Sequence, residues 1–140
     1  MSVLGERSPD ALASLLERIP YARFLGFSLE GTPDRLIGRM AFSEDLIGNA
    51  RARAIHGGTL GAMMELTASC QLLTLPEIKR VPKIINITVE YLRGAVTADV
   101  LARAEIIRHG RRLANVRVVA WQADEQRPVA AANTHYLLAV

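Results

Sequence analysis

Apolar and polar residues recur along the chain with two different periods, and the change between them separates expected helices from expected strands. Near the N-terminus the apolar positions follow the three- and four-residue spacing of an amphipathic helix: Ala11, Leu12, Leu15, Leu16 and Ile19. Ser8 is a favoured N-cap residue and Pro9 suits the first helical position, while Pro20 ends the pattern. We therefore predict a short helix that packs one face on the core.

A hairpin is expected after this helix. Residues 21–30 carry Phe24, Leu25 and Phe27 and are predicted to become extended, and the Gly-Thr-Pro-Asp cluster at 31–34 favours a turn. Residues 36–42 then return as a second strand. Residues 43–55 show no regular period, so we expect irregular structure there.

The longest regular element that the pattern predicts is a helix over about residues 57–75, which ends before Pro76. Its small residues keep it slim on several sides: Gly61, Ala62, Ala68, Ser69 and Cys70. Ser69 and Cys70 are interpreted as packing residues, because nothing marks a base beside either of them. A slim and mostly apolar helix is one that other elements enclose.

Beyond Pro82 the chain becomes rich in valine, isoleucine, threonine and aromatic residues. Four strands are predicted, at residues 84–92, 98–108, 112–123 and 128–138, and the short turns between them favour an antiparallel meander. The fold class is therefore α+β, with one antiparallel sheet against one principal helix in a single domain over residues 1–140. A six-stranded sheet that covers one helix leaves little room for a deep pocket, so we expect a second subunit to supply the missing wall.

Composition narrows the function. Half of the 140 residues are hydrophobic and 22% are charged, which is ordinary for a globular protein. No apolar run approaches a membrane span, residues 1–10 lack an apolar signal core, and one cysteine permits no internal disulfide, so a cytoplasmic protein is expected. The net charge of +3 comes from scattered arginines, which argues against nucleic acid as a partner. His109 and His135 have no partner at metal-ligand spacing, so no metal site is expected.

Candidate chemistry is concentrated in residues 56–65, where His56 precedes Gly57 and Gly58 and an apolar run leads to Glu65. Glycine amides at a helix start are free to polarise a carbonyl. Gly58 and Glu65 lie on nearly the same helix face but about 10 Å apart along the axis. The two ends of the motif therefore cannot serve one carbonyl within one chain, which suggests a composite site across a dimer. The alternative is a glycine turn with Glu65 paired to Arg103 or Arg117.

The order of these motifs resembles the hotdog-fold thioesterases, in particular the PaaI-like acyl-CoA thioesterases. The His-Gly-Gly motif, six further residues and then an acid on a long helix followed by strands carry the resemblance. Further likenesses run from about residue 19 to 138: Ile19-Pro20-Tyr21, Leu25-Gly26, Ile47-Gly48-Asn49, Tyr91-Leu92-Arg93 and Arg108-His109-Gly110-Arg111-Arg112.

The resemblance implies a curved antiparallel sheet wrapped around one long central helix, in dimers or dimers of dimers with sites at the dimer interface. It implies hydrolysis of an acyl-CoA thioester, with CoA as part of the substrate and no other cofactor. Glu65 matches the catalytic acid, as general base or nucleophile, and the Gly57 amide, with that of Gly58 a further candidate, matches the group that polarises the carbonyl. His56 matches the motif histidine, and Asn49 the family asparagine.

Two features depart from the family pattern. Asn49 stands seven residues before His56, where many members have six, and arginines fill the gap. Many members also carry Ser or Thr early in the strand after the helix, where this chain offers Asn86 and then Thr88.

Basic residues in the family line the rim of the CoA site. Arg108, Arg111, Arg112 and Arg93 are therefore interpreted as candidate phosphate-binding residues, against the alternative of a solvated hairpin tip. Leu60, Met63, Met64 and Phe24 are candidates for an acyl pocket, and the acyl group itself stays open. The competing functions are a non-catalytic acyl-CoA-binding or regulatory protein, a hotdog dehydratase or hydratase, and a structural role without ligand.

Overall fold

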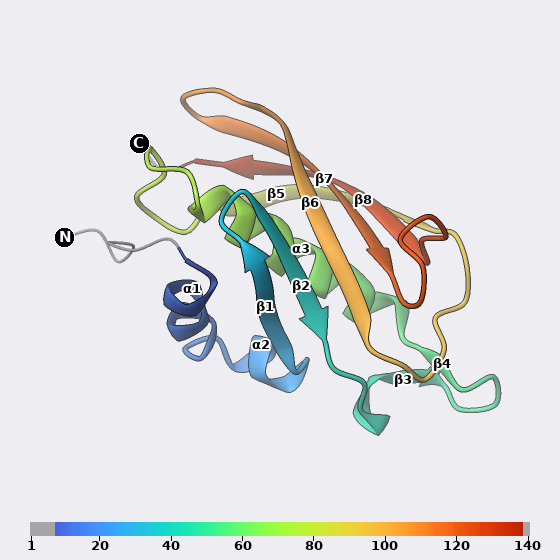
Figure 1. Cartoon of the computed structure of the whole chain (residues 1–140). Helices are drawn as coiled ribbons and strands as arrows, with labels where there is room; N and C mark the ends of the chain where they lie inside the picture. The colour runs from blue at the N-terminus through green and yellow to red at the C-terminus, as the bar shows by residue number, and fades with distance from the viewer. Residues whose placement is uncertain (1–7, 139–140) are drawn as a thin grey trace.

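The computed structural model describes residues 8–138. In this part of the chain a curved six-stranded antiparallel sheet wraps around one long helix, α3 (Gly57–Leu73) (Figure 1). The sheet has the order β1-β2-β6-β7-β8-β5. Its strands are β1 (Phe27–Thr32), β2 (Arg35–Met40), β5 (Lys83–Tyr91), β6 (Val100–His109), β7 (Leu113–Trp121) and β8 (Ala130–Leu137). The α+β class and the sheet around a central helix, both predicted from the sequence, are confirmed.

The strand order corrects one prediction. Strands β6, β7 and β8 form the expected hairpins, but β5 pairs with β8 and not with β6, so the four strands are not a meander. The segment after β5 crosses to the other side of the sheet, where Arg103 of β6 lies opposite Ile37 of β2. Turn residues indicate where a strand ends, but packing around α3 decides which strand it pairs with. As a consequence β5 is an edge strand, with one neighbour among the strands that the structure describes.

The N-terminal region also differs in part from the prediction. Helix α1 (Pro9–Leu16) is confirmed, with the Ser8 hydroxyl accepting a hydrogen bond from the Ala11 amide at 3.2 Å. Residues 20–24 are a second short helix, α2 (Pro20–Phe24), where an extended segment is predicted. Proline at the first helical position explains this, because its fixed φ favours a helix start. The strand begins only after Gly26, whose φ of +61° suits glycine.

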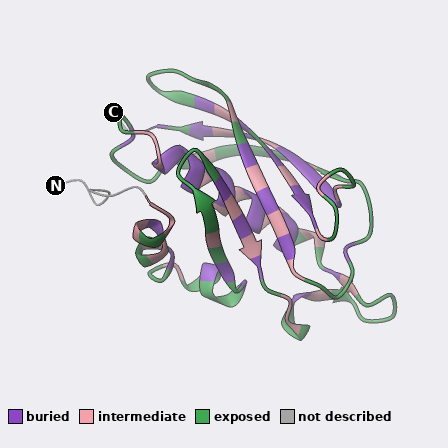
Figure 2. Ribbon diagram, in the orientation of Figure 1, coloured by how far each residue is buried: buried purple, intermediate pink, exposed green. Residues whose placement is uncertain are grey.

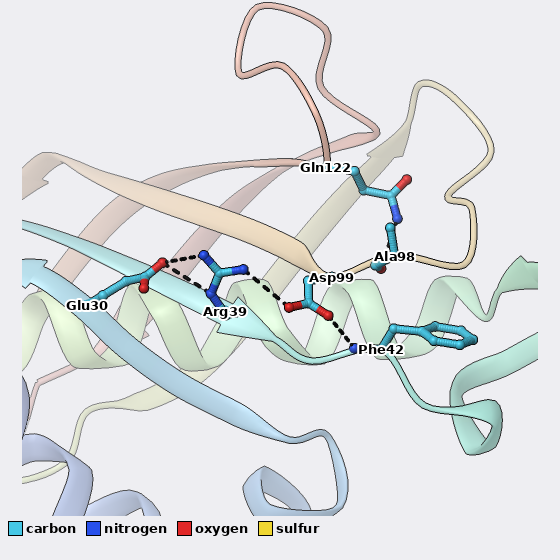
Figure 3. Close-up of polar contacts among 6 residues, drawn as sticks. All are labelled: Glu30, Arg39, Phe42, Ala98, Asp99 and Gln122. Carbon is cyan, nitrogen blue, oxygen red and sulfur yellow. Dashed lines mark hydrogen bonds and ion pairs between the residues drawn. The ribbon is translucent and has the colours of Figure 1, made fainter.

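The segment between β2 and α3 is largely irregular, as predicted, but it contains a short 3₁₀ helix, η1 (Glu44–Leu46). It also contains a small two-stranded sheet of β3 (Ile47–Asn49) and β4 (Ala54–Ile55). A polar network holds the start of this segment (Figure 3). Arg39 links Glu30 to Asp99, and Asp99 accepts a hydrogen bond from the Phe42 amide at 2.8 Å. The network joins β1, β2 and the start of β6, which fixes where the chain leaves the sheet.

Helix α3 is enclosed on most sides, as its composition predicts (Figure 2). Met63 and Met64 are fully buried core residues, which removes both from the candidate acyl pocket. Leu60 is nearly buried but borders the cleft beside Gly57, so it stays a candidate. The remaining positions form one less buried stripe: Gly57, Gly58, Gly61, Ala62, Glu65, Leu66 and Ser69. This open stripe follows the helical repeat, so it is one continuous face of α3. Within residues 8–138 no helix combines the length and apolar character that crossing a bilayer requires.

Candidate active site

The loop ahead of α3 places His56 at the helix start. The His56 amide donates to the Leu46 carbonyl at 2.8 Å, and the preceding Ile55 amide donates to the Ala95 carbonyl at 3.0 Å. Gly48 on β3 lies directly against His56, because a Cβ atom added at Gly48 would stand 2.6 Å from the His56 Cα. A side chain does not fit at Gly48 without moving the His56 backbone. The two-stranded β3–β4 sheet is therefore the support of the histidine.

His56 is the N-cap of α3. Its Nδ1 accepts a hydrogen bond from the Gly58 amide at 2.8 Å, so the neutral ring carries its hydrogen on the exposed Nε2. The Thr59 amide donates to the His56 carbonyl at 3.0 Å. Among the described residues, the Gly57 amide is left without a hydrogen-bond acceptor. Of the two glycines predicted to contact a carbonyl, only Gly57 has a free amide.

Tyr91, at the end of β5, packs against this helix start. Its hydroxyl donates to the Gly57 carbonyl at 3.0 Å, and a Cβ added at Gly57 would lie 2.9 Å from the tyrosine ring. The two residues border a cleft of about 530 Å³ that also includes Leu92 and Arg93. Glycine at position 57 therefore leaves room for both the ring and an approaching ligand. Arg93 borders the same cleft as the free amide, whereas the role of Tyr91 is not apparent from the sequence.

Glu65 lies two turns further along the open stripe and is only half-buried. Burial raises the pKa of its carboxyl group above the ordinary value. The alternative in which Glu65 pairs with Arg103 or Arg117 is wrong, because Arg103 binds Glu125 at 2.8 Å and Arg117 lies 4.0 Å from Glu90. Among the described residues the Glu65 carboxylate has no hydrogen bond and no ion pair. A costly unpaired carboxylate on an open helix face is typical of a functional group.

Two further polar side chains lie beside Glu65. The Tyr136 hydroxyl on β8 donates to the Glu65 carbonyl at 2.8 Å, and the Ser69 hydroxyl donates to the Tyr136 oxygen at 3.1 Å. Ser69 is one helical turn after Glu65 and shares its open face. The sequence analysis treats Ser69 as a packing residue, and its serine-to-tyrosine contact spans 67 residues of chain. Only the α3–β8 packing reveals the pair.

Asn49 shapes the loop before the histidine. Its side-chain oxygen accepts from the amides of Arg51 and Ala52, at 3.1 and 2.9 Å, in a side-chain turn. Arg53 follows with a φ of +55° and forms a two-bond ion pair with Glu44, which holds the pKa of that carboxyl below its ordinary value. Of the two arginines in this loop, Arg53 is thus paired with a carboxylate.

Asn86 and Thr88 are not brought together with Glu65 within one chain. Thr134, opposite Ile87, is fully buried on the helix side of the sheet. Because neighbouring strand residues point to opposite faces, Asn86 and Thr88 lie on the outer face. There the Asn86 side chain contacts the ring of His135 at 3.2 Å.

The candidate phosphate-binding arginines form two groups. Arg93 follows the end of β5 at which Tyr91 pairs with Ala130, whereas the turn of Arg108, Arg111 and Arg112 adjoins Leu113, which pairs with Leu137 opposite Lys83 at the other end. The arginine turn borders its own cleft of about 510 Å³, which also includes His135. In one chain the two groups lie at opposite ends of the sheet. Among the described residues no cluster of three His, Cys, Asp or Glu side chains is arranged to hold a metal ion.

Comparison with known proteins shows which family and which solved structures this chain resembles. The family model of the thioesterase superfamily matches residues 53–129, which include the His-Gly-Gly motif, Glu65 and most of the sheet. A protein of known structure from Chromobacterium violaceum is 33% identical, with 95% of this chain and 93% of that chain covered and a TM-score of 0.75. No match was found among curated proteins.

Two more distant structures share the fold. A thioesterase from Haemophilus influenzae is 19% identical, with 99% of this chain and 95% of that chain covered and a TM-score of 0.83. A candidate thioesterase from Ralstonia eutropha, related to phenylacetic acid degradation, is 22% identical over 90% of this chain and 98% of that chain, with a TM-score of 0.76. Since the family model spans more than half of the sequence, this chain belongs to the thioesterase superfamily and has its hotdog fold.

Proposed function

We propose that the protein hydrolyses an acyl-CoA thioester to a free acid and CoA, at a site that two chains form together. The observation that carries the proposal is on helix α3. Its first amide, that of Gly57, is free, and the half-buried Glu65 carboxylate has no partner among the described residues on the same open face. A donor for an oxyanion and an unpaired base are the two groups that thioester hydrolysis requires.

The chemistry follows from these two groups. The Gly57 amide donates to the carbonyl oxygen of the thioester and makes its carbon more electrophilic. Glu65 in its ionised form either takes a proton from the attacking water or attacks the carbon itself. Negative charge that develops on the carbonyl oxygen is stabilised by the amide and by the positive end of the helix dipole. The carbon–sulfur bond then breaks and CoA leaves as the thiolate, which takes up the proton released by the water. When water attacks directly, the free acid is left. When Glu65 attacks, a mixed anhydride on Glu65 is left, and water hydrolyses it to the free acid and the carboxylate.

Two chains are needed because the groups are too far apart in one chain. Glu65 lies eight positions after Gly57 on α3, which is about 12 Å along the axis. We infer that Glu65 of one chain acts on a carbonyl held by Gly57 of its partner. Strand β5 supports this inference, since no other strand within residues 8–138 lies at its outer edge, and Ile87 and Tyr91 stay exposed on the face toward α3. An exposed apolar edge is a natural surface for pairing with a second copy.

Antiparallel pairing of two β5 strands would also join the two groups of arginines. A two-fold axis across β5 places the Tyr91 end of one chain beside the Lys83 end of the other. The Lys83 end is the one that carries the Arg108–Arg112 turn. Arg93 of one chain and this turn of its partner would then flank one ligand. Arginine suits the phosphates of CoA, which lie well away from the thioester.

The test is release of free thiol from a panel of acyl-CoAs that includes aryl, short-chain and medium-chain members, with enoyl and 3-hydroxyacyl thioesters as further substrates. We expect thiol release by the wild type and a loss of at least about a hundredfold in Glu65→Gln, as for a missing base or nucleophile. Glu105→Gln is the matched control, because Glu105 is an exposed carboxylate on β6. Tight binding of the esters without thiol release, or hydration of the enoyl ester, would overturn the proposal.

A further inference from the structure

Tyr136 places a fully buried hydroxyl group against α3 at the level of Glu65. Its exposed fraction is 0%, and its oxygen lies 2.8 Å from the Glu65 carbonyl and 3.1 Å from the Ser69 hydroxyl. A buried tyrosine hydroxyl requires hydrogen-bond partners, but a backbone carbonyl alone would satisfy it. The second contact, to a serine on the open face of the helix, links the buried phenol to the candidate site.

The direction of both hydrogen bonds is fixed by elementary chemistry. A carbonyl oxygen only accepts, so the single hydrogen of the phenol must go to Glu65. The phenol oxygen is then left as an acceptor, and the hydrogen between Ser69 and Tyr136 must come from Ser69. Burial also raises the pKa of the phenol, so the hydroxyl keeps its hydrogen at any ordinary pH. The Ser69 hydrogen therefore points into the protein, toward β8.

This direction determines what Ser69 presents to the open stripe. With its hydrogen committed to Tyr136, the serine oxygen offers lone pairs only. It lies one turn from Glu65, and side chains four residues apart on a helix are neighbours. The two side chains thus form a pair of acceptors on one face of α3. A water molecule that donates one hydrogen to each of them turns a lone pair away from both, as an attacking water must.

We propose that Tyr136 is a positioning residue, which holds the Ser69 hydrogen toward β8 so that the Ser69 oxygen orients the water used by Glu65. This inference rests on the proposed function and adds to it, because it assigns the polar partner of the acid to α3 and β8. It also makes Ser69 an acceptor and not a nucleophile. The serine hydrogen is directed to a phenol oxygen, which is too weak a base to remove it.

The test compares variants that remove one hydroxyl each. Tyr136→Phe deletes the phenol oxygen and keeps the ring, and Ser69→Ala deletes the acceptor. Thr134→Val is the matched control, because Thr134 is equally buried on the same strand and bonds to Val116, away from α3. The turnover number kcat, the pH profile of kcat, KM and thermal unfolding are measured for each variant and for the double variant Ser69→Ala/Tyr136→Phe.

We expect Tyr136→Phe to lower kcat about tenfold with little change in KM, as for one lost orienting hydrogen bond, and Thr134→Val to keep wild-type kcat although it unfolds more readily. The double variant should be no slower than Ser69→Ala, because Tyr136 acts through Ser69. The midpoint of the rise of kcat with pH should stay in place in Tyr136→Phe, since Glu65 remains the base.

Three results would overturn the inference alone. They are wild-type kcat in Tyr136→Phe, equal losses in Tyr136→Phe and Thr134→Val, and losses that multiply in the double variant. If Tyr136→Phe does not fold, Ser69→Thr against Ser69→Ala decides, since threonine keeps the hydroxyl and must retain activity that alanine loses. A wild type that releases no thiol from any ester would instead remove the proposed function, and this inference with it.

Discussion

The hydroxyl of Tyr91 donates a hydrogen bond to the carbonyl oxygen of Gly57 at 3.0 Å, which ties the end of β5 to the first turn of α3. The contact is made at the protein surface, where the exposed tyrosine ring packs closely against the glycine backbone. Because the same glycine carries the free amide, the bond bears on the direction in which that amide points. The last residue of an edge strand thereby becomes part of the support of the candidate site.

Tyr91→Phe keeps the ring and removes this hydrogen bond. We expect kcat/KM for acyl-CoA hydrolysis to fall by roughly tenfold or less, because an exposed hydrogen bond contributes about 1 kcal/mol. Tyr21→Phe is the matched control, since Tyr21 is a comparably exposed tyrosine stacked on Phe24. Steady-state kinetics of the three proteins provide the measurement. Equal activity of Tyr91→Phe and the wild type would show that the contact is only structural.

Gly48→Ala tests the support of His56. The added methyl would stand 2.6 Å from the His56 Cα, so the backbone must shift and the cap on the Gly58 amide is strained. Losing a helix cap costs about 1 kcal/mol, so we expect the melting temperature to fall by roughly 2–8 °C, together with activity. Gly94→Ala is the control for stability, because its methyl would meet nothing within 4 Å. A Gly48→Ala protein with wild-type melting and kinetics would contradict this account of the loop.

The raised pKa of Glu65 has two consequences of known sign. Activity requires the ionised form, so kcat should rise with pH, with a midpoint above the ordinary range of glutamic acid. Stability should change in the opposite direction. The folded protein holds the proton more tightly than the unfolded chain does, so the free energy of unfolding decreases as pH rises from the unfolded pKa through the folded pKa.

Glu65→Gln should therefore melt above the wild type at neutral pH, and the difference should disappear below the ordinary pKa of glutamic acid. Thermal unfolding of both proteins across this pH range is the measurement. A wild type that is more stable than Glu65→Gln at neutral pH would mean that an unseen partner stabilises the ionised carboxylate.

The sequence predicts the fold well wherever a local pattern specifies an element. Ser8 and Pro9 mark the start of α1, and the composition and turn residues place five of the six strands within a few residues, whereas β1 begins later than predicted. Pairing of β5 with β8 is missed because it depends on contacts across the whole sheet. Helix α2 is missed because its five residues are too few to show a helical period.

The residues of the candidate site also fall into two groups, those that the sequence predicts and those that it does not. His56 and Gly57 lie at the start of α3 and Glu65 lies on one face of the same helix, so their spacing in the sequence is enough to identify them as candidates. Tyr91 and Tyr136 reach the site from β5 and β8, 34 and 71 residues away in sequence from their hydrogen-bond partners Gly57 and Glu65. Periodicity carries no information about such partners, which only the packed sheet provides.

Complementation between inactive chains tests whether the two halves of the motif serve different subunits. Gly57→Ala should be inactive, because its methyl meets the Tyr91 ring at 2.9 Å and fills the cleft beside the amide. Glu65→Gln is inactive through loss of the carboxylate. Each mixed dimer then retains one site with an intact Gly57 from one chain and an intact Glu65 from the other.

Co-refolding the two variants in equal amounts should restore about a quarter of wild-type activity, since half of the dimers are mixed and each has one intact site.

Ile87→Lys in the wild-type background should abolish activity by preventing the dimer from forming. A buried charge at the β5 edge prevents pairing, so we expect a folded monomer in sedimentation experiments without turnover. No recovery on mixing, or an active Ile87→Lys monomer, would mean that Gly57 and Glu65 of the same chain act together at one site. The 12 Å of helix between them, as estimated from the rise of about 1.5 Å per residue, argues against that outcome.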